Sequence, residues 1–195
     1  MNPDILYINE HSSEKYPPRT YYNAKSGDVT IALATDLTTA GEKLTHKAAG
    51  EKYIGFQLDE KVSTLDVARG LYKKLHTTQG ETLNVAGNGI YTLIKAGVSQ
   101  ADINQFVYEV IAQVHHFLPL KRIYCGGQTG VDIAGAVAGY KLGIPTEVTL
   151  PKGFLQRFAT GGDVQGTREK VFEQIELGAQ ALNDYTPVST KKPKP

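Results

Sequence analysis

The sequence predicts an α/β fold of the Rossmann-like, doubly wound type, in which helices flank a mostly parallel sheet. Short runs of apolar and β-branched residues recur without strict alternation, which is typical of strands buried on both faces. Segments with helical spacing of apolar residues separate these runs. The length of 195 residues, with 41% hydrophobic and 21% charged residues, suits a single domain. We place this domain at 1–185 and expect the tail at 186–195, rich in proline and lysine, to be disordered.

Six runs are expected to form the strands of the sheet. Ligands of such folds bind beyond the carboxyl ends of the strands, where loops lead into helices. Polar and glycine-rich residues directly after a run are therefore the first candidates for a binding site. The six runs lie at 4–10, 28–35, 53–58, 81–87, 122–127 and 146–151.

The starts of several helices are readable from capping residues. Ser63 and Asp66 form a capping box ahead of apolar residues that are spaced four apart. Ser99 caps a longer helix, which has a continuous apolar stripe and ends near residue 117. Two further helices are expected at about 129–142 and 167–182.

Composition argues against several classes of function. The formal net charge of +1 gives no basic field of the kind that nucleic-acid binding requires. Cys125 is the only cysteine, which excludes an intramolecular disulfide and a multi-cysteine zinc site, and we predict no metal centre. No run approaches the roughly 20 apolar residues of a membrane span, and no secretory signal is visible at the N-terminus. We therefore expect a soluble, cytoplasmic protein without a membrane partner.

The stretch GGQTG at 126–130 follows the fifth run and opens a helix. Its glycines permit a tight turn, and its glutamine and threonine place polar groups at the helix N-terminus. Unpaired N–H groups and the helix dipole favour an anion there, most naturally a phosphate. A tight connection to a capped helix explains the same residues about as well, and an aspartate in the first turn also complements the dipole. The candidate ligand-binding residues of this turn are Gly126, Gly127, Gln128, Thr129, Gly130 and Asp132.

A second candidate turn, DLTTAGEKLT at 36–45, follows the second run and opens another helix. It is either an N-capped helix with an acidic first turn or a second helix terminus that faces phosphate. A proline-stiffened loop, YPPRTYYN at 16–23, supplies an arginine that could bind phosphate in a bidentate manner. An ordinary salt bridge on a surface loop is the alternative there. The candidate ligand-binding residues of these segments and of the turn after the fourth run are Arg19, Thr39, Gly41, Thr45 and Asn88.

Three blocks of sequence together resemble one family pattern. The blocks are CGGQTGVD (125–132) with GIP (143–145) and PKG (151–153), then RTYYN (19–23) with SGDVTIAL (26–33) and AGEKLT (40–45), and NVAG (84–87). They resemble the molybdenum-cofactor carrier proteins and their wider Rossmann-like superfamily, SLOG, which includes lysine-decarboxylase-like phosphoribohydrolases. The resemblance implies a Rossmann-like fold that binds a nucleotide-derived ligand, and it adds Lys152 and Gly153 to the candidates.

The order of the blocks differs from the family pattern, because GGQTG comes last here and NVAG precedes it. The chain therefore resembles a circular permutant, and we expect a spatial order of strands like that of the family. Glu42 stands where the family has a threonine, and a carboxylate there repels phosphate unless it faces away or meets a ribose hydroxyl. The phosphoribohydrolase signature P-G-G-x-G-T-x-x-E is absent, which argues against nucleosidase chemistry.

We weigh three functions. The first is binding of a nucleotide or nucleotide-derived ligand, with a pterin-type cofactor among the possibilities, by a carrier, sensor or sequestering protein. The second is hydrolysis of an N-glycosidic or phosphoester bond, for which Asp132, Glu42 and Asp36 are weak catalytic candidates. The third is a structural role in which the glycine turns are only connections. Superfamily relatives commonly assemble, so we also expect a homo-oligomer.

Overall fold

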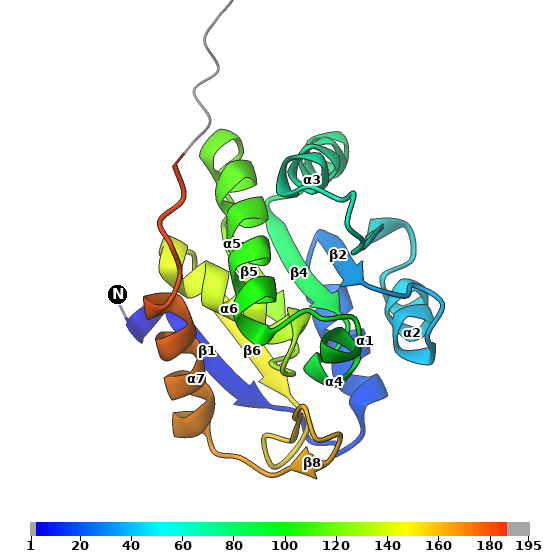
Figure 1. Ribbon diagram of the computed structural model, residues 1–195, viewed down its shortest axis with the longest axis vertical. Helices are drawn as coiled ribbons and strands as arrows, with labels where there is room; N and C mark the ends of the chain where they lie inside the picture. Colours follow the sequence, from blue (N-terminus) through cyan, green and yellow to red (C-terminus); the bar gives the residue numbers. More distant parts are fainter. Residues whose placement is uncertain (1–2, 187–195) are drawn as a thin grey trace, which may run out of the picture.

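The structure is a computed structural model that describes residues 3–186, so the tail predicted at 186–195 lies almost wholly outside the described residues (Figure 1). Its centre is a six-stranded sheet in the order β1-β6-β5-β4-β2-β3, and every neighbouring pair is parallel. All six predicted strands are confirmed, with ends that differ by no more than two residues. They are β1 (Leu6–Glu10), β2 (Val29–Ala34), β3 (Tyr53–Gln57), β4 (Thr82–Gly87), β5 (Arg122–Cys125) and β6 (Thr146–Leu150).

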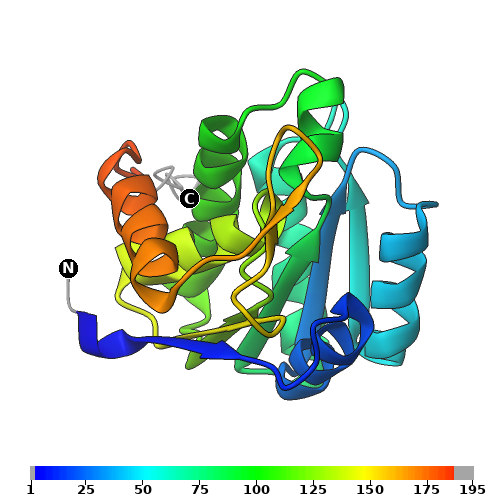
Figure 2. The same cartoon turned by 90° about the horizontal axis from the view of Figure 1, so that it is seen from below.

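Helices cover both faces of this sheet (Figure 2). On one face, α1 (Tyr16–Ser26) packs beside α2 (Ala40–Ala49). On the other face, neighbouring helices pack in the order α3, α5, α6 and α7. These are α3 (Thr64–Thr78), α5 (Gln100–Phe117), α6 (Val131–Leu142) and α7 (Arg168–Gln180), while the short α4 (Ile90–Lys95) follows β4, and η1 (Pro3–Ile5) and η2 (Gly50–Lys52) are single 3-10 turns.

The topology contains a switch point between β2 and β4. Strands β2 and β4 are neighbours in the sheet, yet β2 leads into α2 on one face and β4 leads through α4 into α5 on the other. The two connections therefore diverge at the carboxyl ends of adjacent strands. Divergence of this kind leaves a crevice at that edge, which is where open α/β sheets bind ligands.

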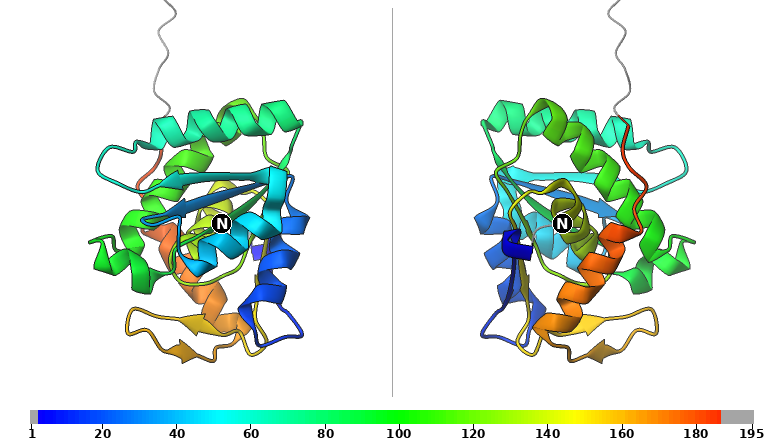
Figure 3. Two further views of the ribbon diagram at one scale, coloured as in Figure 1. Left: turned by 90° about the vertical axis from the view of Figure 1, so that its right-hand side faces the viewer. Right: turned by 90° about the vertical axis from the view of Figure 1, so that its left-hand side faces the viewer.

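Two segments differ from the sequence-based expectation. The loop predicted at 16–23 is instead most of α1, because its two prolines stand in the first turn, where their missing N–H groups would have no partner in the helix. A small antiparallel hairpin, β7 (Gln156–Arg157) with β8 (Asp163–Val164), was not predicted. Two-residue strands are too short to show any hydrophobic period. Figure 3 shows that this hairpin lies at the same end of the sheet as the start of α1.

Helix α6 packs unusually close to the sheet because two of its residues have no side chain. A Cβ atom built on Gly135 would lie 2.6 Å from the Cβ of Val85 on β4. One built on Gly139 would lie 2.1 Å from the Thr146 hydroxyl and 3.1 Å from Ile123. The first ten residues of α6 are buried, since the sheet lies on one side and other helices on the other. This close approach fixes the position at which α6 begins, beside the carboxyl end of β5.

The Gly139→Ala variant tests this packing. We expect it to lower the free energy of unfolding by about 1–3 kcal/mol, because the added methyl group displaces buried atoms of Thr146. Urea unfolding followed by circular dichroism measures the change. Gly162→Ala is the matched control, since Gly162 is exposed and a Cβ there meets no atom within 4 Å. Equal stabilities of the two variants would contradict the close packing.

Candidate functional site

The candidate site is a pocket of about 260 Å³ between α1 and α2, which we call the α1–α2 pocket. Its floor is the carboxyl half of β4, and the turn after β5 and the starts of α4 and α6 complete the wall. It therefore lies at the switch point described above. The lining residues used below are Tyr16, Arg19, Asn23, Gly41, Glu42, Thr45, Asn84, Tyr91, Gly126, Gln128, Asp132 and Arg157.

A buried ion pair forms one wall of the pocket. The Arg19 Nη1 atom on α1 donates to Asp132 Oδ2 on α6 at 2.7 Å, and both side chains are less than one tenth exposed. Burial raises the pKa of Asp132, while the Arg19 guanidinium and a backbone hydrogen bond from Gly87 act in the opposite direction. The pair lies directly over Gly126, because a Cβ there would be 1.5 Å from Arg19 Nη1 and 2.2 Å from Asp132 Oδ2. The ion pair therefore requires glycine at position 126, because any side chain there would overlap it.

A buried carboxyl group, Glu42 in the first turn of α2, forms the opposite wall. Asn88 Nδ2 donates to Glu42 Oε1 at 3.2 Å, and Asn88 Oδ1 accepts from the backbone N–H of Thr35 at 2.9 Å. Because that N–H can only donate, it fixes which end of the Asn88 amide faces Glu42. Burial first, and then the charge of Asp132, raise the pKa of Glu42 to about 7. Glu42 therefore changes protonation state near neutral pH.

Several buried polar atoms on the pocket wall have no hydrogen-bond partner. Burying such an atom costs about 1–3 kcal/mol, so native structures contain few of them. Most of those in the described residues belong to this one pocket. They include Arg19 Nε, Asn23 Oδ1, Glu42 Oε2 and Asn84 Oδ1.

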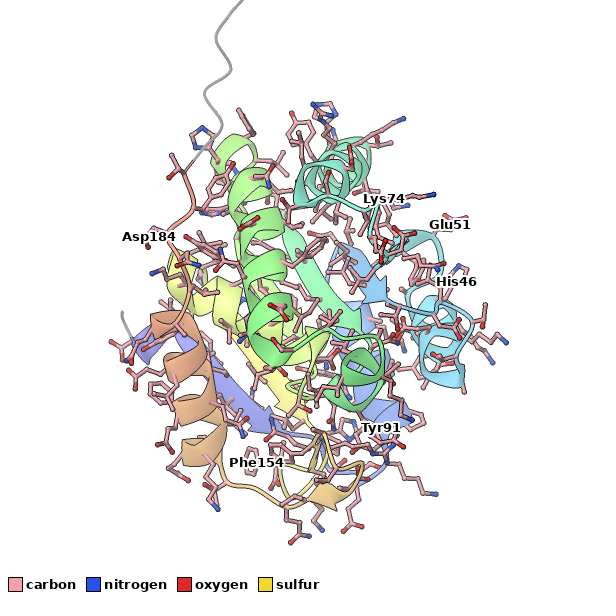
Figure 4. All side chains as sticks on the ribbon, in the orientation of Figure 1. His46, Glu51, Lys74, Tyr91, Phe154 and Asp184 are labelled. Carbon is pink, nitrogen blue, oxygen red and sulfur yellow. The ribbon has the colours of Figure 1, made fainter. Side chains whose placement is uncertain are left out.

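The positive groups of the pocket gather around an aromatic ring. The guanidinium carbons of Arg19 and Arg157 lie 5.7 and 5.9 Å from the centre of the Tyr16 ring, within the range of a cation–π interaction. Burial first, and then Asp163, raise the pKa of Tyr16. Tyr91 contributes a second ring from α4, and Figure 4 shows it at the end of the molecule that carries the β7–β8 hairpin.

The side chains of the GGQTG turn hold the β7–β8 hairpin. Gln128 Nε2 donates to the Leu155 carbonyl at 3.0 Å, and Gln128 Oε1 accepts from the Arg157 N–H at 2.8 Å. The Thr129 hydroxyl donates to the Arg157 carbonyl. In return, Gln156 Nε2 donates to the Gly127 carbonyl at 2.7 Å. The polar residues of the turn thus position the segment that brings Arg157 to the pocket.

The N-terminus of α6 is also occupied by protein groups. The Gly130 N–H donates to Gln100 Oε1 at 2.6 Å, and the Val131 N–H donates to the Asn88 carbonyl at 3.1 Å. The Ile133 N–H donates to the Gln128 carbonyl at 2.9 Å. The expectation of unpaired N–H groups at this terminus is therefore wrong for these three. Two of the partners are distant in sequence, because they come from α5 and from the turn after β4, while the third is local, in the GGQTG turn itself.

The structure brings together part of the predicted site. Arg19, Gly41, Glu42, Thr45, Gly126, Gln128 and Asp132 all line the α1–α2 pocket. Asn88 does not line the pocket, but its amide donates to the carboxyl group of Glu42. Thr39 caps α2 by accepting from the Glu42 N–H. The other candidates make contacts elsewhere. Gly127, Thr129 and Gly130 bond to protein groups within the turn region, and Asp36 is exposed and accepts from Thr38. The backbone N–H groups of Lys152 and Gly153 donate to the Ser13 carbonyl and to the Glu10 carboxylate.

Sequence reasoning missed several residues of the pocket wall. Tyr16 and Asn23 were read as part of a loop, although they lie about one helical turn before and one turn after Arg19 on one side of α1. Asn84 carried a usable signal, since it is an amide within an otherwise apolar buried strand. Arg157 carried none, because its position depends on the hairpin.

Cys125 is a packing residue in this structure. It is fully buried at the end of β5, and burial together with the charge of Asp132 raises the pKa of its thiol to about 12. A thiol of this kind is not a nucleophile at neutral pH.

Comparison of the chain with protein-family models, with curated proteins and with solved structures gives no match. Within residues 3–186, no helix has the length and apolar character needed to cross a bilayer.

The Gly126→Ala variant tests the buried ion pair. Relief of the steric clash requires Arg19 and Asp132 to separate, so we expect a loss of about 3 kcal/mol or more in the free energy of unfolding. Chemical denaturation measures it. Gly41→Ala is the matched control, since a Cβ there meets no atom within 4 Å and alanine favours a helix by up to about 1 kcal/mol. A Gly126→Ala protein as stable as wild type would refute the arrangement.

The Gln128→Ala variant tests the clamp on the hairpin. Without the glutamine amide, the Arg157 N–H loses its acceptor, and we expect amide hydrogen exchange in residues 155–164 to become about tenfold faster or more. Exchange in the six-stranded sheet should stay unchanged. Gln180→Ala, at the exposed end of α7, serves as the control. Unaltered exchange in the hairpin of the Gln128→Ala protein would show that other contacts hold it.

Proposed function

We propose that this protein binds a nucleotide-derived small molecule in the α1–α2 pocket. The observation that carries the proposal is the set of unpartnered buried polar atoms on its wall, at Arg19, Asn23, Glu42 and Asn84. Each of them loses hydration on folding without gaining a partner, and a polar ligand would supply the missing hydrogen bonds. Concentration of these atoms in one pocket favours a binding role over a purely structural one.

The position and chemistry of the pocket favour a nucleotide-like molecule among polar ligands. It lies at the switch point of a parallel sheet, the usual place for nucleotides in doubly wound folds. Arg19 and Arg157 provide positive charge for an anionic group, and Tyr16 and Tyr91 provide rings against which a planar group can stack. The resemblance of three sequence blocks to the SLOG superfamily supports the same class, and carrier, sensor and sequestering roles are all compatible with it.

We expect a phosphate to bind at the start of α2 rather than at the start of α6. Gly41, at the second position of α2, lines the pocket, and the space beside it is open. The N–H groups of α6 that the sequence suggested are instead bonded to protein groups. The anionic part of the ligand is therefore expected near Gly41 and the two arginines.

A second candidate function is hydrolysis of an N-glycosidic bond. The observation that favours it is a pair of carboxyl groups in different environments, Glu42 with a pKa of about 7 and Asp132 paired with Arg19. Such a pair can provide a general acid and a carboxylate that stabilises positive charge on a ribose. Binding ranks first because a bound ligand by itself accounts for the unpartnered polar atoms on the pocket wall.

Native mass spectrometry of the freshly purified protein tests the proposal. We expect a bound nucleotide, dinucleotide or pterin-like molecule at one copy per chain, which denaturation should release for identification. The protein should then be incubated with a panel of ribonucleotides. Intact ligand recovered after incubation supports binding, whereas release of a free base supports the hydrolase. No bound molecule and no binding of any panel member would overturn both.

The Gly41→Leu variant tests the location. A leucine at this position should enter the open space of the pocket and weaken ligand binding by about tenfold or more, while the helix itself tolerates it. Isothermal titration with the ligand found above measures the affinity. Gly162→Leu places the same side chain in open space outside the pocket, and its affinity should match wild type. Equal affinity of the two variants would move the site elsewhere.

A further inference from the structure

We infer that the α1–α2 pocket recognises its ligand through vicinal hydroxyl groups, such as those of a ribose, one of which donates a hydrogen bond to Glu42 Oε2 and the other to the amide oxygen of Asn84 or of Asn23. The inference rests on the proposed function, because it names which part of the nucleotide-derived ligand the pocket reads. It also gives a role to the buried carboxyl group of Glu42, which would have no function in a turn that binds only phosphate.

One carboxyl oxygen of Glu42 already has a hydrogen-bond partner in the protein. Oε1 accepts from the Asn88 amide, whose orientation the Thr35 N–H fixes. Oε2 is buried and has no partner, and the whole residue is 3% exposed. The hydrogen bond that Glu42 lacks must therefore form at Oε2.

Two other unpartnered atoms of the pocket wall are acceptors. Asn23 Nδ2 donates to the Thr149 carbonyl at 3.4 Å and Asn84 Nδ2 donates to Thr30 Oγ1 at 3.2 Å, which leaves Oδ1 of each amide unpartnered. An amide oxygen can only accept. A phosphate also only accepts when it is fully ionised, so it cannot satisfy this wall. Hydroxyl groups can, because each of them carries a donor.

The pocket wall also carries positive donors. Arg19 Nε is unpartnered, and the Arg157 guanidinium lies on the same aromatic ring of Tyr16 as that of Arg19. A ligand that carries both adjacent hydroxyl groups and an anionic group can satisfy the acceptors and the positive donors at once. A sugar phosphate, as found in every ribonucleotide, is such a molecule.

Binding of a donor at Oε2 has a consequence for protons. The free carboxyl is half protonated at about pH 7, and its proton occupies Oε2, since Oε1 already accepts. A hydroxyl that donates to Oε2 favours the ionised form, so the bound state holds fewer protons than the free state. Affinity should then rise with pH and level off above about 7. The ionisable groups that face or contact Glu42 or its partners are Arg19, Asp36, Tyr53 and Asp132.

The experiment compares matched ligands on the intact protein. The ribonucleotide of the panel that binds most tightly is titrated beside its 2′-deoxy and 3′-deoxy forms. We expect at least one deoxy form to bind about tenfold more weakly or worse, because it leaves a buried acceptor unpaired. If both bind within twofold of the ribonucleotide, the hydroxyl inference is overturned while the proposed function stands. If no nucleotide binds at all, both are overturned.

A second measurement determines directly how many protons are released when the ligand binds. Titration calorimetry at pH 6 in two buffers of different ionisation enthalpy should show release of up to about one proton per ligand, and almost none at pH 8. Glu42→Gln should abolish the release and weaken binding, since the amide can place a donor where the hydroxyl needs an acceptor. Glu51→Gln, an exposed position near the end of α2, should behave as wild type. Proton uptake on binding would show instead that Glu42 donates to the ligand, and would overturn the inference.

Discussion

The hydrogen-bonded ion pair between Arg19 and Asp132 joins two helices that lie on opposite faces of the sheet. Arg19 belongs to α1 and Asp132 to α6, and they meet beyond the carboxyl end of β5, where Gly126 leaves room for them. An isolated charge at that depth would be strongly unfavourable, so each group requires the other. The ion pair sets the distance between α1 and the sheet. The other elements of the pocket wall take their positions relative to this contact.

The glycine-rich turn serves this arrangement in a way that its sequence does not reveal. Its first glycine accommodates the ion pair, and Gln128 and Thr129 hold the hairpin that presents Arg157. The residues most suggestive of a phosphate loop are thus engaged with the protein itself. The contribution of the turn to the pocket is to position other residues and to align Gln128 along its wall.

Glu42 shows the tension between stability and function at this site. Its folded-state pKa of about 7 exceeds the ordinary value of 4.5, because burial disfavours the ionised form. The stability that its protonation contributes is fully present below the ordinary pKa and is lost as pH rises through about 7. A fold selected only for stability has no reason to bury a carboxyl oxygen without a partner. Retention of this group is what we expect of a residue that a ligand completes.

The sequence by itself determined the class of fold and the edge of the sheet at which to search. Apolar runs and capping residues are local signals, so six strands and most of the helices followed from them, and glycine turns marked the carboxyl ends of β2 and β5. Tertiary structure decided which polar groups face the pocket. The α6 N–H groups found partners 30 residues away in α5 and some forty residues away in the turn after β4, and Asn84 and Arg157 entered the wall through strand order and hairpin placement. Hydrogen-bond saturation depends on such distant neighbours, and no local pattern encodes it.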